Sequence, residues 1–314
     1  MTGKIENEPA TLYLHKSGNI VFAALYTFSN NESGPVTISR GTIEGKMVKF
    51  DGLQGSFSND HFSGTGSWNH MIHFPFSFVV NKDSLLNDLD FISVTGDTTI
   101  TSSAAGNINF FAAGIWPSHN MEPGKSFYLK ELISEQFNQK THQELNEILT
   151  KQKNIFYTPV KLKDGTHANI DEQEVLVVYE NRNLLSIVNI THSYTSETKE
   201  KFTNTYTVAD LVHKRTLNLI DMMGTEGVDK LPDLLKQSFK QHFASKYKGQ
   251  STPVIITEHG DIQPNDNFYV TSKGLCFNYR PGEICDPAFG QVELSIPFTL
   301  LTAYLTPAIT SLMK

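Results

Sequence analysis

A chain of 314 residues with 39% hydrophobic and 11% aromatic residues is long enough for two or three domains with sizeable cores. Its formal net charge of −7 argues against a nucleic-acid partner, because phosphate binding needs clustered Lys and Arg. No run of 18 apolar residues and no hydrophobic signal region is present, so no transmembrane segment is predicted. If the protein is exported, we expect this chain to be the mature form or a trimmed version of it, and any lipid anchor to have been lost with the signal peptide. The start at Met1–Pro9 is polar enough to be a tether or an artificial end.

Short alternating segments in the first part of the chain predict an antiparallel β-domain, which we place at residues 1–82. Apolar and polar side chains alternate, as in half-buried strands, over Ile20–Phe28, Val36–Ile38, Val48–Phe50 and Ile72–Val80. Turn-forming residues such as Ser17-Gly18-Asn19 and Asp51-Gly52 separate them. This spacing is typical of a meander, a sandwich or a small barrel.

A mixed pattern follows a linker predicted at Lys82–Leu89. A helix is predicted from about Phe127 to Ile148, with Ser126 as its N-cap. Strands are predicted at Phe91–Ile100, Asn107–Ile115, Val175–Tyr179 and Leu184–Ile190. This order indicates an α+β fold, an antiparallel sheet with helices packed on one face.

The same pattern repeats further along the chain. Residues Phe202–Val208 alternate as a strand. An amphipathic helix is predicted where Leu231, Leu235, Phe239, Phe243 and Tyr247 recur every four residues. Pro232 suits only the first turn of that helix. Strands are then predicted at Val254–Thr257 and Phe268–Thr271.

The C-terminal part contains two alternating strands joined by an ordered loop. Leu275, Phe277 and Tyr279 alternate into the turn signal Pro281-Gly282. The second strand alternates from Val292 to Phe298, and Pro297 places its end at a sheet edge.

This hairpin resembles the signature of the RsiV-like family, a Tyr-x-Pro-Tyr-Glu-Ile-Ala run followed by a glycine, a strand and Ile-Pro. The chain reads Tyr279-Arg280-Pro281-Gly282-Glu283-Ile284-Cys285, then Gly290, a strand and Ile296-Pro297. The strand before Leu219-Ile220-Asp221 is similar to the family's strand and leucine-aspartate motif. The family is named for the extracytoplasmic domain of a lysozyme-sensing anti-sigma factor, and it forms the non-catalytic part of some peptidoglycan deacetylases.

The resemblance covers roughly residues 185–305 and, more loosely, the chain from about residue 90. It implies an RsiV-like region at 83–314, with a deacetylase-associated part at 83–190 and an RsiV-like part at 191–314. Gly64–Trp68 resembles the glycine-x-tryptophan strand of small β-domains that precede this region in bacterial envelope lipoproteins. The resemblance implies a periplasmic or outer-membrane-anchored protein that binds rather than catalyses. The family's loop rich in glycine and histidine is replaced here by Thr195–Glu200.

Cys276 and Cys285 are the only cysteines, and they flank the predicted turn. Two alternatives remain open from the sequence. A disulfide could close this short loop in an oxidising compartment, or both could be unpaired thiols. No Cys-x-x-Cys is present, so zinc and thioredoxin-like chemistry are not expected.

Other polar residues provide no recognisable catalytic or metal site. His70 and His73 stand an odd number of residues apart on a predicted strand and therefore point to opposite faces. Glu258-His259 is read as a polar turn, because no nucleophile motif accompanies it. We predict no enzyme activity, no catalytic residue, no metal and no cofactor.

Three functions follow in order of preference. The first is a non-catalytic envelope protein that binds a protein, with a lysozyme-type muramidase as the partner to test, or a cell-wall glycan. The alternatives are a small-ligand-binding barrel within residues 9–82 and a cell-wall glycan hydrolase. The predicted binding residues are Tyr279, Arg280, Glu283, Trp116 and Trp68. For each tryptophan a core role is the competing interpretation, and for Glu283 the competing role is to hydrogen-bond backbone amides of its loop.

Overall fold

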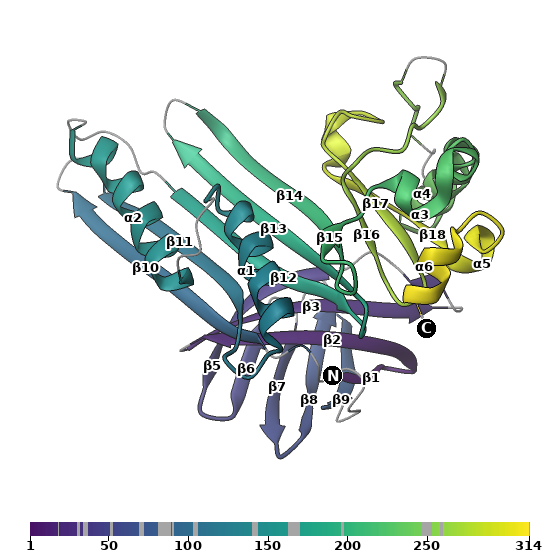
Figure 1. Cartoon of the computed structure of the whole chain (residues 1–314). Helices are drawn as coiled ribbons and strands as arrows, with labels where there is room; N and C mark the ends of the chain where they lie inside the picture. The colour runs from purple at the N-terminus through teal and green to yellow at the C-terminus, as the bar shows by residue number, and fades with distance from the viewer. Residues whose placement is uncertain are drawn as a thin grey trace.

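The computed structural model describes most of the chain, in the ranges 1–17, 19–29, 32–33, 37–50, 53–68, 72–80, 89, 91–102, 106–139, 144–162, 170–195, 198–246, 253–257 and 260–313. Three β-sheets and two layers of helices make up the α+β architecture predicted from the sequence (Figure 1).

The first sheet is antiparallel and curls on itself. Its strand order is β2-β1-β9-β8-β7-β6-β5-β3-β4, and β2 also pairs with β3. The strands are β1 (Thr2–Ile5), β2 (Glu8–Ser17), β3 (Ile20–Ser29), β4 (Glu32–Ser33), β5 (Thr37–Glu44), β6 (Met47–Phe50), β7 (Leu53–Ser58), β8 (His61–Trp68) and β9 (Ile72–Val79). The expectation that the polar start is a tether was wrong, because Thr2–Ile5 pairs with both β2 and β9.

Aromatic side chains pack inside the curled sheet. The rings of Phe57 and Phe62 stack with centroids 4.8 Å apart, and Phe62 contacts Phe76 at 4.9 Å. Gly66 makes room for this packing, because a Cβ at this position would lie 2.1 Å from the ring of Phe74. The described interior side chains therefore pack against one another as a core.

The second sheet follows the chain order from β10 to β15. Its strands are β10 (Phe91–Ser102), β11 (Gly106–Pro117), β12 (Ile170–Glu180), β13 (Leu184–Thr195), β14 (Thr198–Asp210) and β15 (Arg215–Thr216). All its pairs are antiparallel except β11–β12, which is parallel because two helices cross between these strands. These helices, α1 (Pro123–Gln136) and α2 (Leu145–Leu162), cover one face of the sheet (Figure 1).

The single helix predicted over Phe127–Ile148 is in fact these two helices. Helix α1 starts earlier because Glu122, not Ser126, is its N-cap and accepts the backbone N–H groups of Gly124 and Lys125 at 2.8 and 2.6 Å. It ends at Gln136, and Asn138 then adopts a left-handed conformation with φ of 55°.

The third sheet contains the predicted C-terminal hairpin. Its antiparallel strands are β16 (Phe268–Val270), β17 (Gly274–Tyr279) and β18 (Val292–Pro297). One face packs against the helices α3 (Leu219–Val228), α4 (Leu231–Lys246), α5 (Phe298–Leu301) and α6 (Pro307–Leu312). Pro232 lies in the first turn of α4, as predicted. The strand predicted at Val254–Thr257 was wrong, because this segment is irregular.

The opposite face of the third sheet packs on the second sheet. The rings of Tyr206 and Tyr269 stack with centroids 4.3 Å apart. The buried Ser186 hydroxyl donates to the carbonyl oxygen of Val270 and accepts its N–H, both at 3.1 Å. The second sheet is thus sandwiched between α1 and α2 on one side and the third sheet on the other.

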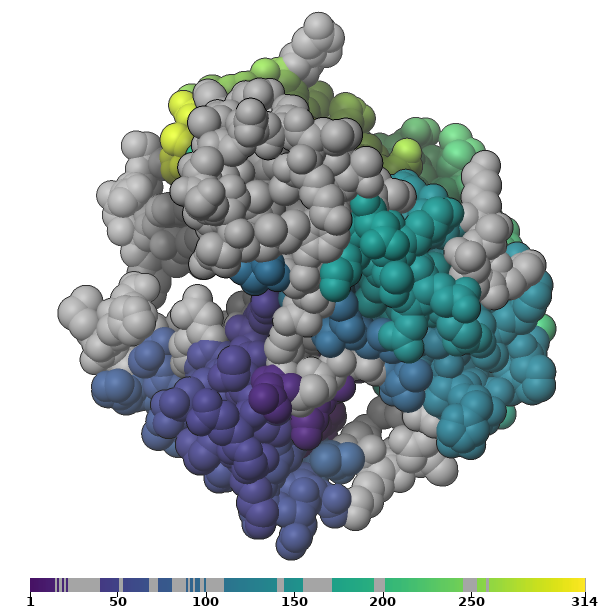
Figure 2. Space-filling view, turned by 90° about the vertical axis from the view of Figure 1, so that its left-hand side faces the viewer, coloured from purple at the N-terminus to yellow at the C-terminus, as the bar shows by residue number. Residues whose placement is uncertain are grey.

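The curled sheet also contacts the second sheet. The Tyr13 hydroxyl accepts the N–H of Glu180 at 3.2 Å. Figure 2 shows the curled sheet in purple and blue beside the layer that contains α2 in teal. Of the linker predicted at Lys82–Leu89, only Leu89 lies within the described residues, and it is buried against the helix-covered face of the second sheet. The division into domains at 1–82 and 83–314 stays a prediction.

Within the described parts of the chain, none of the helices combines the length and the apolar character needed to cross a membrane.

Candidate functional site

The loop between β17 and β18 is held from within by Glu283. One carboxylate oxygen, Oε2, accepts the backbone N–H of Arg280 at 2.8 Å. The other, Oε1, accepts an N–H of the Asn265 side chain at 3.0 Å. The N–H of Glu283 in turn donates to the carbonyl oxygen of Arg280 at 3.0 Å. Glu283 therefore supports the loop, as the competing interpretation from the sequence anticipated.

The second half of the same loop has its own local support. The Asp286 side chain accepts the N–H of Ala288 at 2.8 Å and caps a short 3₁₀-helix at Pro287–Phe289. Ile284 and Cys285 point into the core, at 2% and 1% exposure. The loop is thus anchored in the core by Ile284 and Cys285, and its exposed residues are Arg280, Pro281, Glu283, Asp286, Pro287 and Ala288.

Tyr279 does not belong to this outer surface. It is buried at 1% exposure, and its hydroxyl donates to the carbonyl oxygen of Gln263 at 3.0 Å. Burial raises the pKa of the phenol, and the nearby Glu283 carboxylate raises it further. Tyr279 is therefore a core residue at the base of the loop rather than a contact residue.

A second polar cluster lies below the loop. The Asn278 side chain, 1% exposed, donates to Glu293 Oε1 at 3.1 Å. The same carboxylate oxygen accepts the Tyr206 hydroxyl at 2.7 Å. Burial, reinforced by Glu293, raises the pKa of Tyr206 well above its ordinary value, so the phenol stays neutral and acts as a donor. Asn267 completes the cluster, because its side chain donates to Asn278 at 3.2 Å and accepts the N–H of Tyr206 at 2.8 Å. This cluster fixes β14 of the second sheet to the strands that carry the loop.

The predicted tryptophans do not form an exposed platform. Trp116 is 2% exposed, and its Nε1–H donates to Glu144 Oε2 at 2.8 Å. Glu144 also accepts from Lys130 at 2.7 Å, so the three side chains join β11, α1 and the residue before α2. Trp116 therefore has the core role that was its competing interpretation. Trp68 ends β8, and its side chain lies outside the described part of the structure.

Cys276 and Cys285 are free buried thiols. Cys276 packs toward the second sheet, whereas Cys285 packs among the helices on the other face of the third sheet. Burial raises the pKa of Cys276 to about 12 and also raises that of Cys285. Because a disulfide needs closely spaced and facing Cβ atoms, the structure agrees with the unpaired alternative.

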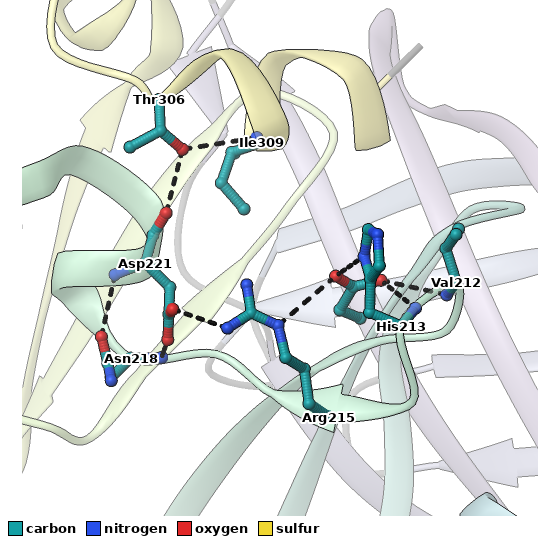
Figure 3. A network of polar contacts seen from close by, with 8 residues as sticks. Val212, His213, Arg215, Asn218, Asp221, Thr306 and Ile309 are labelled. Atoms are coloured by element: carbon teal, nitrogen blue, oxygen red, sulfur yellow. Dashed lines mark hydrogen bonds and ion pairs between the residues drawn. The ribbon is translucent and has the colours of Figure 1, made fainter.

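Another polar network, which sequence reasoning missed, closes the end of β14 (Figure 3). The Asp210 carboxylate is 1% exposed and accepts the N–H groups of Val212 and His213, both at 3.0 Å. Its other oxygen lies 2.7 Å from His213 Nδ1. The His213 side chain is 61% exposed, so the carboxylate orients an accessible imidazole.

The same network continues into the helical layer. Arg215 lies 2.8 Å from the Asp221 carboxylate, which forms a capping box with Asn218 at the start of α3. Thr306, the N-cap of α6, donates to the carbonyl oxygen of Asp221 at 2.9 Å. The network therefore joins β14, α3 and α6. The sequence signal for this network is slight: Asp210 and His213 stand three residues apart at the end of a strand.

Two carboxylates meet between the curled sheet and the second sheet. Arg40 of β5 lies 3.4 Å from Glu172 and 3.8 Å from Glu174, and its guanidinium sits 3.6 Å above the ring of Phe111. Glu172 also lies 3.2 Å from His192 Nδ1. Burial raises the pKa of Glu174 to about 7, against the opposing effect of Arg40. These charges pair across the contact between two sheets.

The remaining histidines and acids do not form a metal cluster in the described residues. There, no three or more His, Cys, Asp or Glu side chains are grouped as metal ligands. His73 is exposed on β9, while His70, Glu258 and His259 lie outside the described residues.

Comparisons with known proteins agree with this architecture. Residues 220–299 match the family described as "Protein of unknown function (DUF3298)". This match spans α3, α4 and the third sheet, including the loop between β17 and β18. No curated protein matches the chain.

Two solved structures share the fold at low sequence identity. A member of the DUF3298 family from Bacteroides fragilis is similar with a TM-score of 0.55 and 23% identity, over 71% of this chain and 97% of that one. A DUF3298 family protein from Pseudomonas aeruginosa is similar with a TM-score of 0.54 and 12% identity, over 72% of this chain and 98% of that one. At these identities the likeness shows the fold alone.

Proposed function

We propose that this protein is a non-catalytic binding protein of the bacterial cell envelope, whose loop at residues 280–291 recognises a protein or a cell-wall glycan. The observation that carries the proposal is that some side chains of this loop hold its shape while others are left to contact a partner. The side chains of Glu283 and Asp286 are exposed but make hydrogen bonds within the loop, while the exposed side chains of Arg280, Pro281 and Pro287 are left to contact a partner. A loop that is ordered before binding loses less conformational entropy when a partner arrives.

The same observation supports recognition rather than chemistry. A general acid or base must be able to exchange a proton with a substrate. In this loop both carboxylates accept hydrogen bonds from backbone N–H groups, and the Tyr279 phenol is buried. Arg280, with its exposed guanidinium, suits a carboxylate-bearing partner surface or a sugar.

The RsiV-like resemblance supports the location and the first partner to test. It favours a periplasmic or outer-membrane-anchored protein and a lysozyme-type muramidase. The net charge of −7 would steer a basic partner of this kind toward the protein. A cell-wall glycan is the other ligand within the proposal.

The test is a calorimetric titration of the full chain. One titration uses a lysozyme-type muramidase, and a parallel one uses soluble peptidoglycan fragments. Arg280→Ala should weaken binding by about 5- to 30-fold, the range of an interface arginine worth 1–2 kcal/mol. Arg182→Ala, in the turn between β12 and β13, is the matched control and should bind as the wild type does. Melting temperatures of both variants should stay at the wild-type value.

Two results would count against the proposal. Absence of muramidase binding at micromolar concentration would refute that partner. Equal affinities of the wild type and Arg280→Ala for whichever ligand binds would show that the loop is not the recognition surface.

A further inference from the structure

A cleft of about 510 Å³ lies where α1 ends above the second sheet, next to α2. Its volume falls in the range of small-molecule sites, roughly 300–1,000 Å³. Of its eleven lining residues, Phe110 and Phe137 are buried, and the other nine carry polar side chains. The cleft is therefore unlike the mostly apolar pockets that bind drug-like ligands.

Side-chain amides build a rigid wall for this cleft. Gln173 and Asn189 both donate to the carbonyl oxygen of Gln136, at 2.7 and 3.0 Å. Gln173 also donates to the Asn189 side chain at 3.0 Å, and Gln152 donates to Gln173 at 3.2 Å and to the carbonyl oxygen of Phe137 at 3.1 Å. These bonds satisfy carbonyl groups at the end of α1 and fix the amide orientations. The wall is thus ordered before any ligand enters.

Other polar groups of the lining are not used in this way. Among the described residues, the side chains of Asn138, Asp171 and Thr191 have no hydrogen-bond partner. Asn138 and Asp171 are exposed, and Thr191 is half-buried on β13. They offer an amide, a carboxylate and a hydroxyl, a mixture of donors and acceptors, to a molecule in the cleft.

The charges of the lining limit the class of ligand. Glu135 and Asp171 are negative, and no Lys or Arg is among the lining residues. These two carboxylates disfavour phosphate or carboxylate ligands, although Lys151 lies nearby and donates to the lining residue Gln139 at 2.9 Å. A hydroxyl group both donates and accepts, as a side-chain amide does, so a molecule with many hydroxyl groups matches this wall. A cationic ligand could use the two carboxylates and the acceptor oxygens, but it would leave the amide N–H donors unused.

We propose that this cleft binds a neutral polyhydroxylated ligand of the saccharide class, with Thr191 and Asp171 contacting its hydroxyl groups and the Gln173–Asn189 amides forming the wall. The proposal does not depend on recognition by the loop at residues 280–291.

The test uses the full chain and three neutral disaccharides, N,N′-diacetylchitobiose, cellobiose and maltose, with spermidine as the cationic probe. Binding is followed by calorimetry at low and high salt. We expect at least one disaccharide to bind, with an affinity that salt does not change, because no net charge is neutralised. Thr191→Val should weaken this binding by about tenfold, the equivalent of one hydrogen bond of about 1.4 kcal/mol.

The controls separate a lost contact from a lost fold and from the other proposal. Valine suits a strand, so Thr191→Val should melt as the wild type does. Thr65→Val, exposed on β8 of the curled sheet, is the matched substitution outside the cleft and should leave binding unchanged. Arg280→Ala should also leave disaccharide binding unchanged.

Three outcomes would overturn the proposal. The first is that no disaccharide binds at about 10 mM, a concentration that detects even weak complexes. The second is that disaccharide binding is the same in Thr191→Val and the wild type. The third is that only spermidine binds, in a salt-sensitive way that Asp171→Asn abolishes, which would identify a cation site instead.

Discussion

Glu174→Gln should stabilise this protein at high pH and leave its stability unchanged at low pH. Glu174 is 8% exposed on β12, and burial raises the pKa of its carboxyl from 4.5 to about 7, although Arg40 opposes this rise. In the unfolded chain the carboxyl should titrate near its ordinary value. The folded state therefore binds the proton more tightly than the unfolded state does.

The sign of the pH dependence follows from this difference. Well below pH 4.5 the carboxyl is protonated in both states, so it costs no stability. Between pH 4.5 and 7 the unfolded state releases its proton first, and the free energy of unfolding falls as the pH rises. Above pH 7 the full cost of the buried charge is present. With 1.36 kcal/mol for each pKa unit, a rise from 4.5 to about 7 gives about 3 kcal/mol.

Urea unfolding of the wild type and Glu174→Gln at pH 4.5, 6 and 8 measures this cost. The variant has a neutral amide of the same size, so we expect it to be more stable by about 2–3 kcal/mol at pH 8, by less at pH 6, and by almost nothing at pH 4.5. Glu44→Gln, an exposed change on β5, should differ little from the wild type at every pH.

Two results would refute the reasoning. A stability difference that is the same at all three pH values would show that Glu174 does not carry a shifted pKa. A variant less stable than the wild type at pH 8 would show that the pairing with Arg40 outweighs the cost of burial.

Substitutions at two positions and one labelling experiment test the scaffold of the C-terminal region. Glu283→Ala should lower the free energy of unfolding by about 1–3 kcal/mol, because two hydrogen bonds to its carboxylate are lost. Glu283→Gln should lower it less. Equal melting temperatures of the wild type and both variants would contradict the scaffold role. Ser186→Ala should lower the free energy of unfolding in denaturant by about 1–3 kcal/mol, because the buried N–H and carbonyl groups of Val270 lose their partner. An unchanged free energy of unfolding would show that the packing of the second and third sheets does not depend on this contact. Cys276 and Cys285 should resist a thiol reagent in the native state and both react after unfolding without reductant; a missing thiol in the unfolded protein would reveal a disulfide.

The sequence determined those elements whose signal is local. The C-terminal hairpin, helix α4 and most strands of the curled sheet follow from side chains that alternate or recur within one segment, and such periodicity directly reflects which face is buried. The α+β class followed from the order of these segments. The break between α1 and α2 was missed because Phe137 and Leu145 keep a helical spacing across the polar residues 138–144. Helix α1 ends at the C-cap Phe137, and the left-handed Asn138 then turns the chain away.

Only the tertiary structure decided where the predicted site residues lie. Trp116, Tyr279 and Glu283 were predicted as binding residues, but neighbours distant in sequence give the first two core roles and the third a scaffold role. Trp116 is held by Glu144, and Glu283 by Asn265, and no local pattern reveals these pairs.

The cleft beside α1 and the network around Asp210 had almost no signal in the sequence. Each is formed by single polar residues from several strands and helices, and such residues look like ordinary surface positions when read one segment at a time. The periodicity of a segment fixes which side of a strand or helix is buried, and this is why the sequence determined the elements and the fold class. Which polar side chains meet depends on the packing of sheets and helices against each other, and this only the folded chain decides.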